Sequence, residues 1–529
     1  MKIRSSLLLA CTAAALAAAV DYDTDGKRWW SHIEFLASDD LQGRNTGSEG
    51  HLKAARYLAT QYERAGLKPA GTSGYFQPVP FEVKEIVEKQ SSLALVRNGK
   101  TEKLLLGDDA TLGLRGDIQP DTEAGAVFAG YALKVPEKNY DDLAGLDLKG
   151  KIVIFLAGGP ASIPGPLKSH YSSAGERWKF LKAAGAVGIA SIQNPKSMDI
   201  PWSRAALSRF MPSMSLADPA LDESQGMRLA ITINAERADK FFQGTGHTMA
   251  EILRDADNNK PLPHFAIPGA IRAHVQLKTS KVESQNVVAL LPGTDPKLKD
   301  EYVILSAHLD HVGVGEPING DKIYNGAMDD ASGIASDLEI ARMLHDSNDK
   351  LRRSVLVLAV TGEEKGLQGS RYFAAHPTVN GKNIIADINM DMFLPLFPLH
   401  YLEVQGLGES TLGDDIRVVA KAAGVEVQAD KEPDRNRFIR SDQYSFIRRG
   451  IPALAFKFGW VPGTPEQKIF NDWLRDRYHA PSDDLNQPVD KPAAAQFNRI
   501  ILSLTERVAN ANSRPEWKPD SFFRRFAGE

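Results

Sequence analysis

From residue 283 onward, short apolar runs alternate with helical stretches, and this alternation limits the folds open to the chain. Residues 332–345, for example, repeat apolar side chains at helical spacing. Such an alternation predicts an α/β/α sandwich, in which a mixed sheet with a parallel centre lies between layers of helices. The runs that we expect to form buried strands are residues 286–291, 302–307, 354–360, 384–390 and 451–456.

The length of 529 residues indicates more than one domain. Residues 27–66 look helical, with Ser48 as a helix cap, and residues 75–115 look like β-hairpins. Near Gly125 the pattern of residue types changes, and apolar runs follow that are separated by a loop rich in Gly and Pro. We therefore expect a leader at 1–19, a first part of the main domain at 20–115, an inserted β-rich domain at 116–275 and the rest of the main domain at 276–529.

The N-terminus resembles a secretory signal. Lys2 and Arg4 precede a small apolar stretch, and Ala17-Ala18-Ala19 fits a cleavage site. The stretch is short for a membrane span, so we expect an exported protein, periplasmic or secreted, whose mature form has no transmembrane anchor. Cys11 is the single cysteine and would suit a lipoprotein cleavage box, but the apolar run continues past it, which favours cleavage near Ala19 and a mature chain without disulfides.

The overall charge excludes some classes of partner. Lys and Arg number 63 against 67 Asp and Glu, a net charge of −4, which gives no basic surface for nucleic acid. Two common hydrolase motifs are also missing. No His is followed by Glu, so there is no His-Glu-x-x-His helix, and there is no Gly-x-Ser-x-Gly sequence.

Polar side chains follow three of the expected strands. His308 comes after the strand that ends at Ala307, and Glu363-Glu364 follow the strand that ends at Val360. Asp391 comes at the end of the strand that begins at residue 384. Open α/β sheets place their sites at the carboxyl ends of strands, so we expect these side chains to meet there.

With Asp329 and His479, the set contains enough ligands for two zinc ions. Zinc takes His nitrogen and carboxylate oxygen, and a carboxylate with two oxygens can bridge two metals. Two terminal ligands on each metal and one shared ligand make five. Asp310 lies two residues from His308 and can hold its other ring nitrogen. Glu363 precedes the ligand Glu364 and can act as the general base that deprotonates the attacking water.

The motifs together resemble the co-catalytic di-zinc aminopeptidases, a family that also contains glutamate carboxypeptidase and the transferrin receptor. The resemblance covers residues 27–510. The matching segments, in chain order, are His308-Leu309-Asp310, Gly326-Ala327-Met328-Asp329-Asp330-Ala331-Ser332-Gly333, Glu363-Glu364, Asp391-Met392 and Tyr478-His479. The opening segment Leu36-Ala37-Ser38-Asp39-Asp40-Leu41-Gln42-Gly43-Arg44 resembles members that carry an inserted protease-associated domain.

This resemblance implies roles for the residues. Asp329 would be the bridging ligand, with His308 and Asp391 completing one zinc site and Glu364 and His479 the other. Glu363 would be the base, Asp310 would orient His308, and Tyr478 would polarise the scissile carbonyl, as a Tyr does in some relatives. Arg440 would contact the substrate. The Asp329–Asp330 peptide bond is often cis in such enzymes. Gln443 departs from the family pattern, where many relatives have His, so proton handling at that position is in doubt.

We therefore expect a zinc-dependent aminopeptidase with two Zn2+ per chain, acting on peptides with a free N-terminus. Three alternatives remain open: a carboxypeptidase of the glutamate carboxypeptidase type, a one-zinc glutaminyl cyclase, and a non-catalytic receptor on the same fold. The complete ligand set and the intact Glu363 argue against the receptor. The acidic residues Glu363, Asp391 and Asp330 favour an aminopeptidase, whereas the Arg-rich stretch around Arg440 is the best argument for a carboxypeptidase.

Overall fold

A computed structural model describes residues 20–347, 350–435 and 437–528. The expected leader at 1–19, with Cys11, lies outside the described residues. Within the described residues, no helix is both long enough and apolar enough to cross a bilayer.

The described residues place ten strands in the main sheet, in the order β11-β2-β14-β18-β15-β19-β22-β20-β21, with β1 paired to β14. The four central strands β18, β15, β19 and β22 are parallel to one another. The strands next to them run in the opposite direction: β14 is antiparallel to β18, and β20 is antiparallel to β22. The strands are β1 (Lys68–Pro69), β2 (Phe76–Ile86), β11 (Ser213–Leu216), β14 (Leu277–Leu291), β15 (Tyr302–His308), β18 (Ser354–Val360), β19 (Ile384–Asn389), β20 (Tyr401–Gln405), β21 (Glu426–Ala429) and β22 (Ala453–Phe458).

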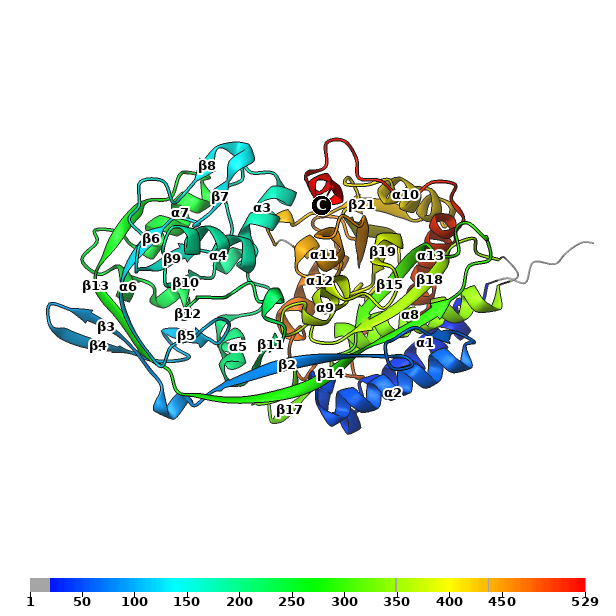
Figure 1. Cartoon of the computed structure of the whole chain (residues 1–529), viewed down its shortest axis with the longest axis horizontal. Helices are drawn as coiled ribbons and strands as arrows, with labels where there is room; N and C mark the ends of the chain where they lie inside the picture. The colour runs from blue at the N-terminus through cyan, green and yellow to red at the C-terminus, as the bar shows by residue number, and fades with distance from the viewer. Residues whose placement is uncertain (1–19, 348–349, 436, 529) are drawn as a thin grey trace, which may run out of the picture.

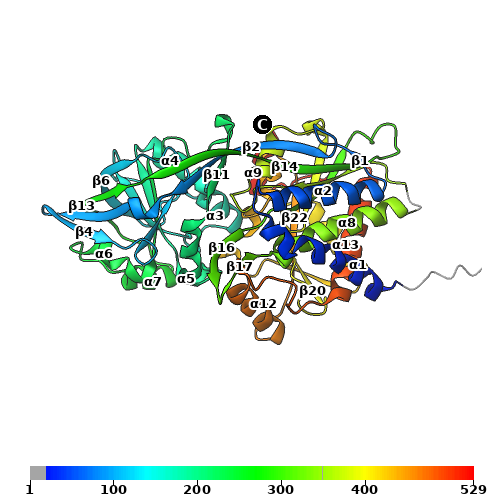
Figure 2. The same ribbon diagram turned by 90° about the horizontal axis from the view of Figure 1, so that it is seen from below.

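Successive side chains of the central strands point to opposite faces of this sheet, so both faces are apolar and helices cover both of them. Val303 and Leu305 pack into the core under one helical layer, whereas Ile304 packs with Phe373 and Phe446 under the other. The expected α/β/α sandwich with a parallel centre is therefore confirmed (Figure 1). The first layer contains α1 (Tyr22–Leu36), α2 (Glu49–Arg64), α8 (Ser332–Asp346) and α13 (Lys491–Asn510), which lie side by side in Figure 2, and the second contains α9 (Gln368–Ala375) and α11 (Gln443–Ile447).

A second sheet forms a separate lobe with its own core (Figure 1). The sheet begins at Ser92, so the expected domain start at residue 116 falls inside it and is too late in the chain. The hairpin of β3 and β4, and β5, belong to this lobe and not to the main domain. Its strands are β3 (Ser92–Arg97), β4 (Lys100–Leu104), β5 (Ala110–Gly113), β6 (Asp121–Ala129), β9 (Ile152–Leu156), β10 (Gly188–Ile192), β12 (Leu229–Ile233) and β13 (His264–His274).

The two lobes share a long antiparallel ribbon. Strands β2 and β14 pair residue by residue from Phe76–Val287 to Ile86–Leu277, and Figure 1 shows them running from one lobe into the other. Strand β11, which the chain reaches from within the second lobe, adds to the outer side of β2. The lobes are therefore joined by paired backbone as well as by side-chain contacts.

Candidate active site

The predicted ligands come together at the carboxyl ends of neighbouring parallel strands. His308 is the last residue of β15, Glu364 follows β18 and Asp391 follows β19, and β18 and β19 flank β15 in the sheet. Asp329 lies in a short segment, Ala327–Ala331, that leads into α8 and is not helical at Asp329 and Asp330. His479 follows α12 (Pro465–Asp476) in a left-handed backbone conformation, with φ of 51°. The strand-end placement expected from the sequence is what brings these segments together.

Asp329 lies between two groups of side chains. Its Oδ1 is 3.1 Å from His308 Nε2, which is in turn 3.7 Å from Asp391 Oδ1. Its Oδ2 faces the other way and lies 3.3 Å from His479 Nε2. One carboxylate thus directs one oxygen into each group, which is the arrangement that a bridging ligand requires.

The second group contains a histidine that the sequence analysis did not single out. Glu364 Oε2 is 3.1 Å from His479 Nε2, and Glu364 Oε1 is 2.8 Å from His311 Nδ1. His311 is fully buried, and its Nδ1 is also 3.7 Å from Asp329 Oδ2. His308, Asp329 and Asp391 therefore form one set of three converging ligand atoms, and His311, Asp329 and Glu364 form another. The sequence signal that could have identified His311 as a candidate ligand was its position one residue after Asp310.

Asp330 has a different role from its neighbour Asp329. Asp330 accepts hydrogen bonds from three backbone N–H groups, those of His308, Gly333 and Met392. It thereby ties the ends of β15 and β19 to the start of α8. Because Asp330 is fully buried and engaged in this way, it does not line the pocket. The peptide bond between Asp329 and Asp330 is cis, as the family resemblance implied.

Two further charged residues that the sequence analysis gave no role hold the ligand-bearing loops. Asp483 accepts hydrogen bonds from the backbone N–H groups of Met328 and Asp329, at 2.9 and 3.0 Å. The buried Arg44 donates to the carbonyls of Leu309 and Gly326, which belong to the loops on either side. Both residues fix backbone, so a loss of either should move the predicted ligands on these loops.

Asp310 acts on His308 through its backbone and not through its side chain. The ring Nδ1 of His308 lies 2.9 Å from the Asp310 carbonyl oxygen. The Asp310 carboxylate instead accepts hydrogen bonds from the Thr46 hydroxyl at 2.7 Å and from the Glu363 backbone N–H at 3.1 Å. The expected carboxylate–histidine contact is therefore corrected to a carbonyl contact, and the side chain positions the base instead.

Electrostatics at the site reflect the crowding of acids and histidines. Burial alone would lower the pKa of His308, but the carboxylates of Asp329 and Asp391 raise that pKa well above its usual value. Burial raises the pKa of Glu363 well above the ordinary range for a glutamate, and the carboxylates of Glu364 and Asp391 add to the increase. A raised pKa makes a carboxylate a better proton acceptor near neutral pH.

The residues present fit a pair of metal ions. Asp329 Oδ2, Glu364 Oε1, Asp391 Oδ1 and both ring nitrogens of His311 are buried and have no hydrogen-bond partner of suitable geometry. Buried unpaired carboxylates are costly, and several of them together repel one another. Nitrogen and carboxylate donors of this kind are those that zinc takes, and dications in the two sets would neutralise the excess negative charge.

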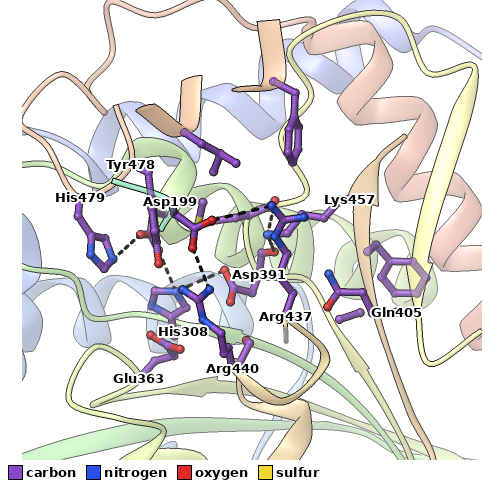
Figure 3. A pocket seen from close by; sticks show the side chains of 17 residues that line it. Asp199, His308, Glu363, Asp391, Gln405, Arg437, Arg440, Lys457, Tyr478 and His479 are labelled. Carbon is purple, nitrogen blue, oxygen red and sulfur yellow. Dashed lines mark hydrogen bonds and ion pairs between the residues drawn. The ribbon is translucent and has the colours of Figure 1, made fainter. Parts of the chain in front are cut away.

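A pocket opens outward from the two sets and is lined by residues of both lobes (Figure 3). Asp199, from the second lobe, lies 2.8 Å from Arg440 and 2.5 Å from Arg435, and it is 4.0 Å from Arg437. These arginines hold the pKa of Asp199 below its usual value although burial opposes them. Tyr478 also lines the pocket, next to His479, and burial raises its pKa well above the ordinary value for tyrosine.

The far side of the pocket combines apolar walls with cations. Met392, Phe456, Phe470 and Leu474 line it together with Lys457, Arg437 and Gln405. Burial lowers the pKa of Lys457, and the neighbouring Arg437 lowers it further although Asp391 acts in the opposite direction.

Residues 286–505, which carry all the predicted ligands, match the model for peptidase family M28. This segment is similar to the peptidases of family M28. One curated relative, the "probable leucine aminopeptidase 2" of Aspergillus oryzae, is 30% identical over 276 residues, which are 49% of this chain and 51% of the relative. Carboxypeptidase Q of Xenopus laevis is 30% identical over 129 residues, or 23% of this chain and 25% of that protein. The chain thus aligns with about half or less of the length of these curated relatives.

The fold extends beyond the segment that the M28 model matches. An aminopeptidase from Aneurinibacillus sp. strain AM-1 superposes with a TM-score of 0.55 and 21% identity, covering 93% of this chain and 95% of the other. At this level of identity the match supports a shared fold and nothing finer. Both the main sheet and the second lobe fall within the superposed region, since it includes nearly the whole chain.

Proposed function

We propose that this chain is a zinc-dependent aminopeptidase that removes N-terminal residues from peptides. The single observation that carries the proposal is the position of Asp329, whose two oxygens face two separate sets of unpartnered buried ligands. The name of the Aspergillus relative supports the same class of reaction. The inserted lobe would be the protease-associated domain, and the mature, exported protein would begin near Val20.

The residues divide the work as follows. Zinc bound at the two sets would supply a nucleophile by lowering the pKa of a water molecule. Glu363 would act as the general base that takes up a proton from the attacking water and returns it to the leaving amine, and the Asp310 carboxylate holds the Glu363 backbone in place. Tyr478 lines the same pocket, and its hydroxyl would donate a hydrogen bond to the carbonyl oxygen of the scissile bond.

The ligands would hold two zinc ions per chain. His308 and Asp391 complete one set, Glu364 and His479 complete the other, and Asp329 is shared. His311 would give the second zinc an additional nitrogen.

Zinc content measured by mass spectrometry tests this assignment. We expect Asp329→Ala to lose both ions, because the bridging carboxylate also screens the repulsion between two dications. His479→Ala should lose mainly one. Asp329→Ala protein that retained two zinc ions would overturn the bridge.

A free peptide N-terminus is the feature that an aminopeptidase must recognise, and the acidic groups Glu363 and Asp391 in the pocket suit an α-ammonium. N-acetylation of a good peptide substrate should therefore abolish cleavage, and C-terminal amidation should have little effect. Steady-state rates on the two blocked peptides and on the free peptide measure this directly. The opposite pattern would contradict the proposal while leaving the metal ligands as assigned.

A carboxypeptidase is the second candidate, favoured by the cations of the pocket. Arg437, Arg440 and Lys457 all line it, and a terminal carboxylate needs such groups. Two of them already have acidic partners, since Arg440 pairs with Asp199 and Arg437 pairs with Glu432 at 2.9 Å. The carboxypeptidase therefore ranks second.

A further inference from the structure

One cation in the pocket lacks an acidic partner. Lys457 Nζ donates to two backbone carbonyls, those of Asp391 at 3.0 Å and Met392 at 2.9 Å. Among the described residues, no carboxylate oxygen lies within 4.0 Å of this ammonium group. An ammonium has three N–H donors, so one remains for another acceptor.

The neighbouring strand provides a second unused donor. Gln405 of β20 lies opposite Ala455 of β22, and Glu403 lies opposite Lys457, so all four side chains are on one face of the sheet. Gln405 lines the pocket and is only 3% exposed, and its Nε2 has no hydrogen-bond partner. Glu403 has Lys431 within 3.6 Å instead of Lys457.

Apolar side chains surround these donors. Met392, Phe470 and Leu474 line the same pocket, and Phe470 also lies under the Arg437 guanidinium, 5.6 Å from its ring centre. An unpaired ammonium and an unpaired amide donor within such walls are costly until an acceptor arrives. The complementary ligand has a short aliphatic part that ends in an anionic or strongly polar oxygen group.

We propose that Lys457 and Gln405 form a subsite for a carboxylate, and that this carboxylate is the side chain of an N-terminal Glu or Asp in the substrate. The inference rests on the proposed aminopeptidase activity and gives it a substrate class. A side-chain carboxylate is separated from the scissile carbonyl by methylene groups, which match the apolar walls. A C-terminal carboxylate has no such spacer, and the arginines nearest the outer part of the pocket are already paired with Asp199.

The subsite is tested with p-nitroanilides of Glu, Gln and Leu, assayed on the zinc-loaded full-length enzyme. Glu and Gln have the same shape and differ in charge, so the ratio of their kcat/KM values isolates recognition of the carboxylate. We expect a ratio of about ten or more, because a hydrogen bond to a charged group is worth roughly 1.4 kcal/mol more than a neutral one. The ratio does not depend on the fraction of enzyme that is active.

Two variants locate the recognition. Lys457→Met should bring the Glu-to-Gln ratio close to one, and Gln405→Leu should lower kcat/KM for both Glu and Gln relative to Leu. Lys468→Met is the matched control, because Lys468 is on the outer side of α12 with its side chain 78% exposed. The ratio of this control should equal that of the wild type. Zinc content is measured on every variant, because Lys457 also contacts the backbone of a ligand residue.

The outcomes separate the subsite from the activity. An enzyme that cleaves the Leu substrate but prefers Gln to Glu would overturn the subsite and leave the aminopeptidase intact. A ratio that survives Lys457→Met would overturn the role of Lys457. An enzyme that cleaves N-acetylated peptides, and fails only when their C-terminus is amidated, would overturn both proposals and assign the carboxylate site to the chain terminus.

Discussion

At the residue scale, the two members of each adjacent acidic pair have different roles because their carboxylates point in different directions. Asp329 faces the two ligand sets, whereas Asp330 accepts hydrogen bonds from the backbone beneath them. Glu364 faces His311 and His479, whereas Glu363 lines the pocket where substrate enters. A change of either member of a pair should therefore give a distinct defect.

Glu363→Gln tests this separation. Glutamine keeps the shape of the side chain but cannot accept the proton, so kcat should fall about 10²–10⁴-fold while zinc content stays unchanged. Steady-state kinetics and metal analysis on the same sample measure both quantities. Glu364→Gln is the matched comparison and should lose zinc from one set. Normal turnover in Glu363→Gln would exclude Glu363 as the base.

The convergence of the predicted ligands could be foreseen because polar residues at strand ends are visible in a sequence. His308, Glu364 and Asp391 followed from that rule. His311 was missed because its approach to Glu364 depends on how the chain turns after β15. The backbone contact from Asp310 to His308 was also missed, because the spacing is the same whether the carbonyl or the carboxylate makes the contact.

At the scale of elements, the start of α8 has to pass very close to β19. A Cβ added to Gly333 would lie 1.9 Å from the Met390 carbonyl oxygen and 2.5 Å from Asp330 Oδ2. A glycine is therefore required there for packing, and the last residue of the Gly-Ala-Met-Asp-Asp-Ala-Ser-Gly motif has a steric explanation.

We expect Gly333→Ala to lower stability by about 1–3 kcal/mol or more, because backbone must move to admit the methyl group. The same shift should weaken zinc binding, since Asp330 ties the strands that carry His308 and Asp391. Thermal unfolding and zinc content measure the two effects. Gly408→Ala is the control, since nothing lies within 4 Å of its added Cβ. Equal melting temperatures for the two variants would contradict the steric argument.

Glu403 on β20 should make stability depend on pH. Burial raises the pKa of Glu403 to about 7, and Asp430 adds to the increase. The folded chain then keeps a proton that the unfolded chain releases at its ordinary, lower pKa. Stability should fall as pH rises from about 4.5 to 7, by at most about 3 kcal/mol, and then level off.

Glu403→Gln should weaken this dependence of stability on pH. Melting temperatures at pH 5 and pH 7.5 should differ less for the variant than for the wild type. Because glutamine has no proton to release, the variant should be the more stable of the two at pH 7.5. An unchanged difference between the two pH values would show that Glu403 does not titrate in this window.

Element boundaries were harder to predict than the elements themselves. The central strands of the main sheet and α8 fall within a few residues of their expected ranges, because their apolar patterns are long and regular. A hairpin such as β3 and β4 is defined by its local sequence, which does not show that β3 pairs with β13 in the second sheet. That ambiguity is the physical reason for the misplaced boundary at residue 116.

At the scale of the whole molecule, the second lobe contributes to the active-site pocket. Asp199 is the only residue of that lobe, among those the structure describes, that lines the pocket, and it contacts three arginines of the main lobe. Nothing in the sequence connected this aspartate with residues more than 230 positions later in the chain. The structure therefore gives the lobe a structural part in the site.

Asp199→Asn should leave the arginines without their shared partner. We expect a loss of about 1–3 kcal/mol in stability, reduced from the value for a fully buried pair because Arg440 is partly exposed, and a fall in kcat/KM of about tenfold. Asp218→Asn is the control, because Asp218 also joins the lobes, through His376 at 3.0 Å, but does not line the pocket. A loss of stability with full activity would show that the contact only fastens the lobes.

The ribbon of β2 and β14 also determines how peptides can reach the metals. Two lobes joined by a single flexible linker can open wide, but here an opening motion must bend a hydrogen-bonded strand pair that spans both lobes. We expect this pairing to limit how far the lobes separate beside Asp199. A narrow entrance would admit a slack chain end more readily than the middle of a folded polypeptide, so we expect the scaffold to favour trimming from an end over cutting within a chain.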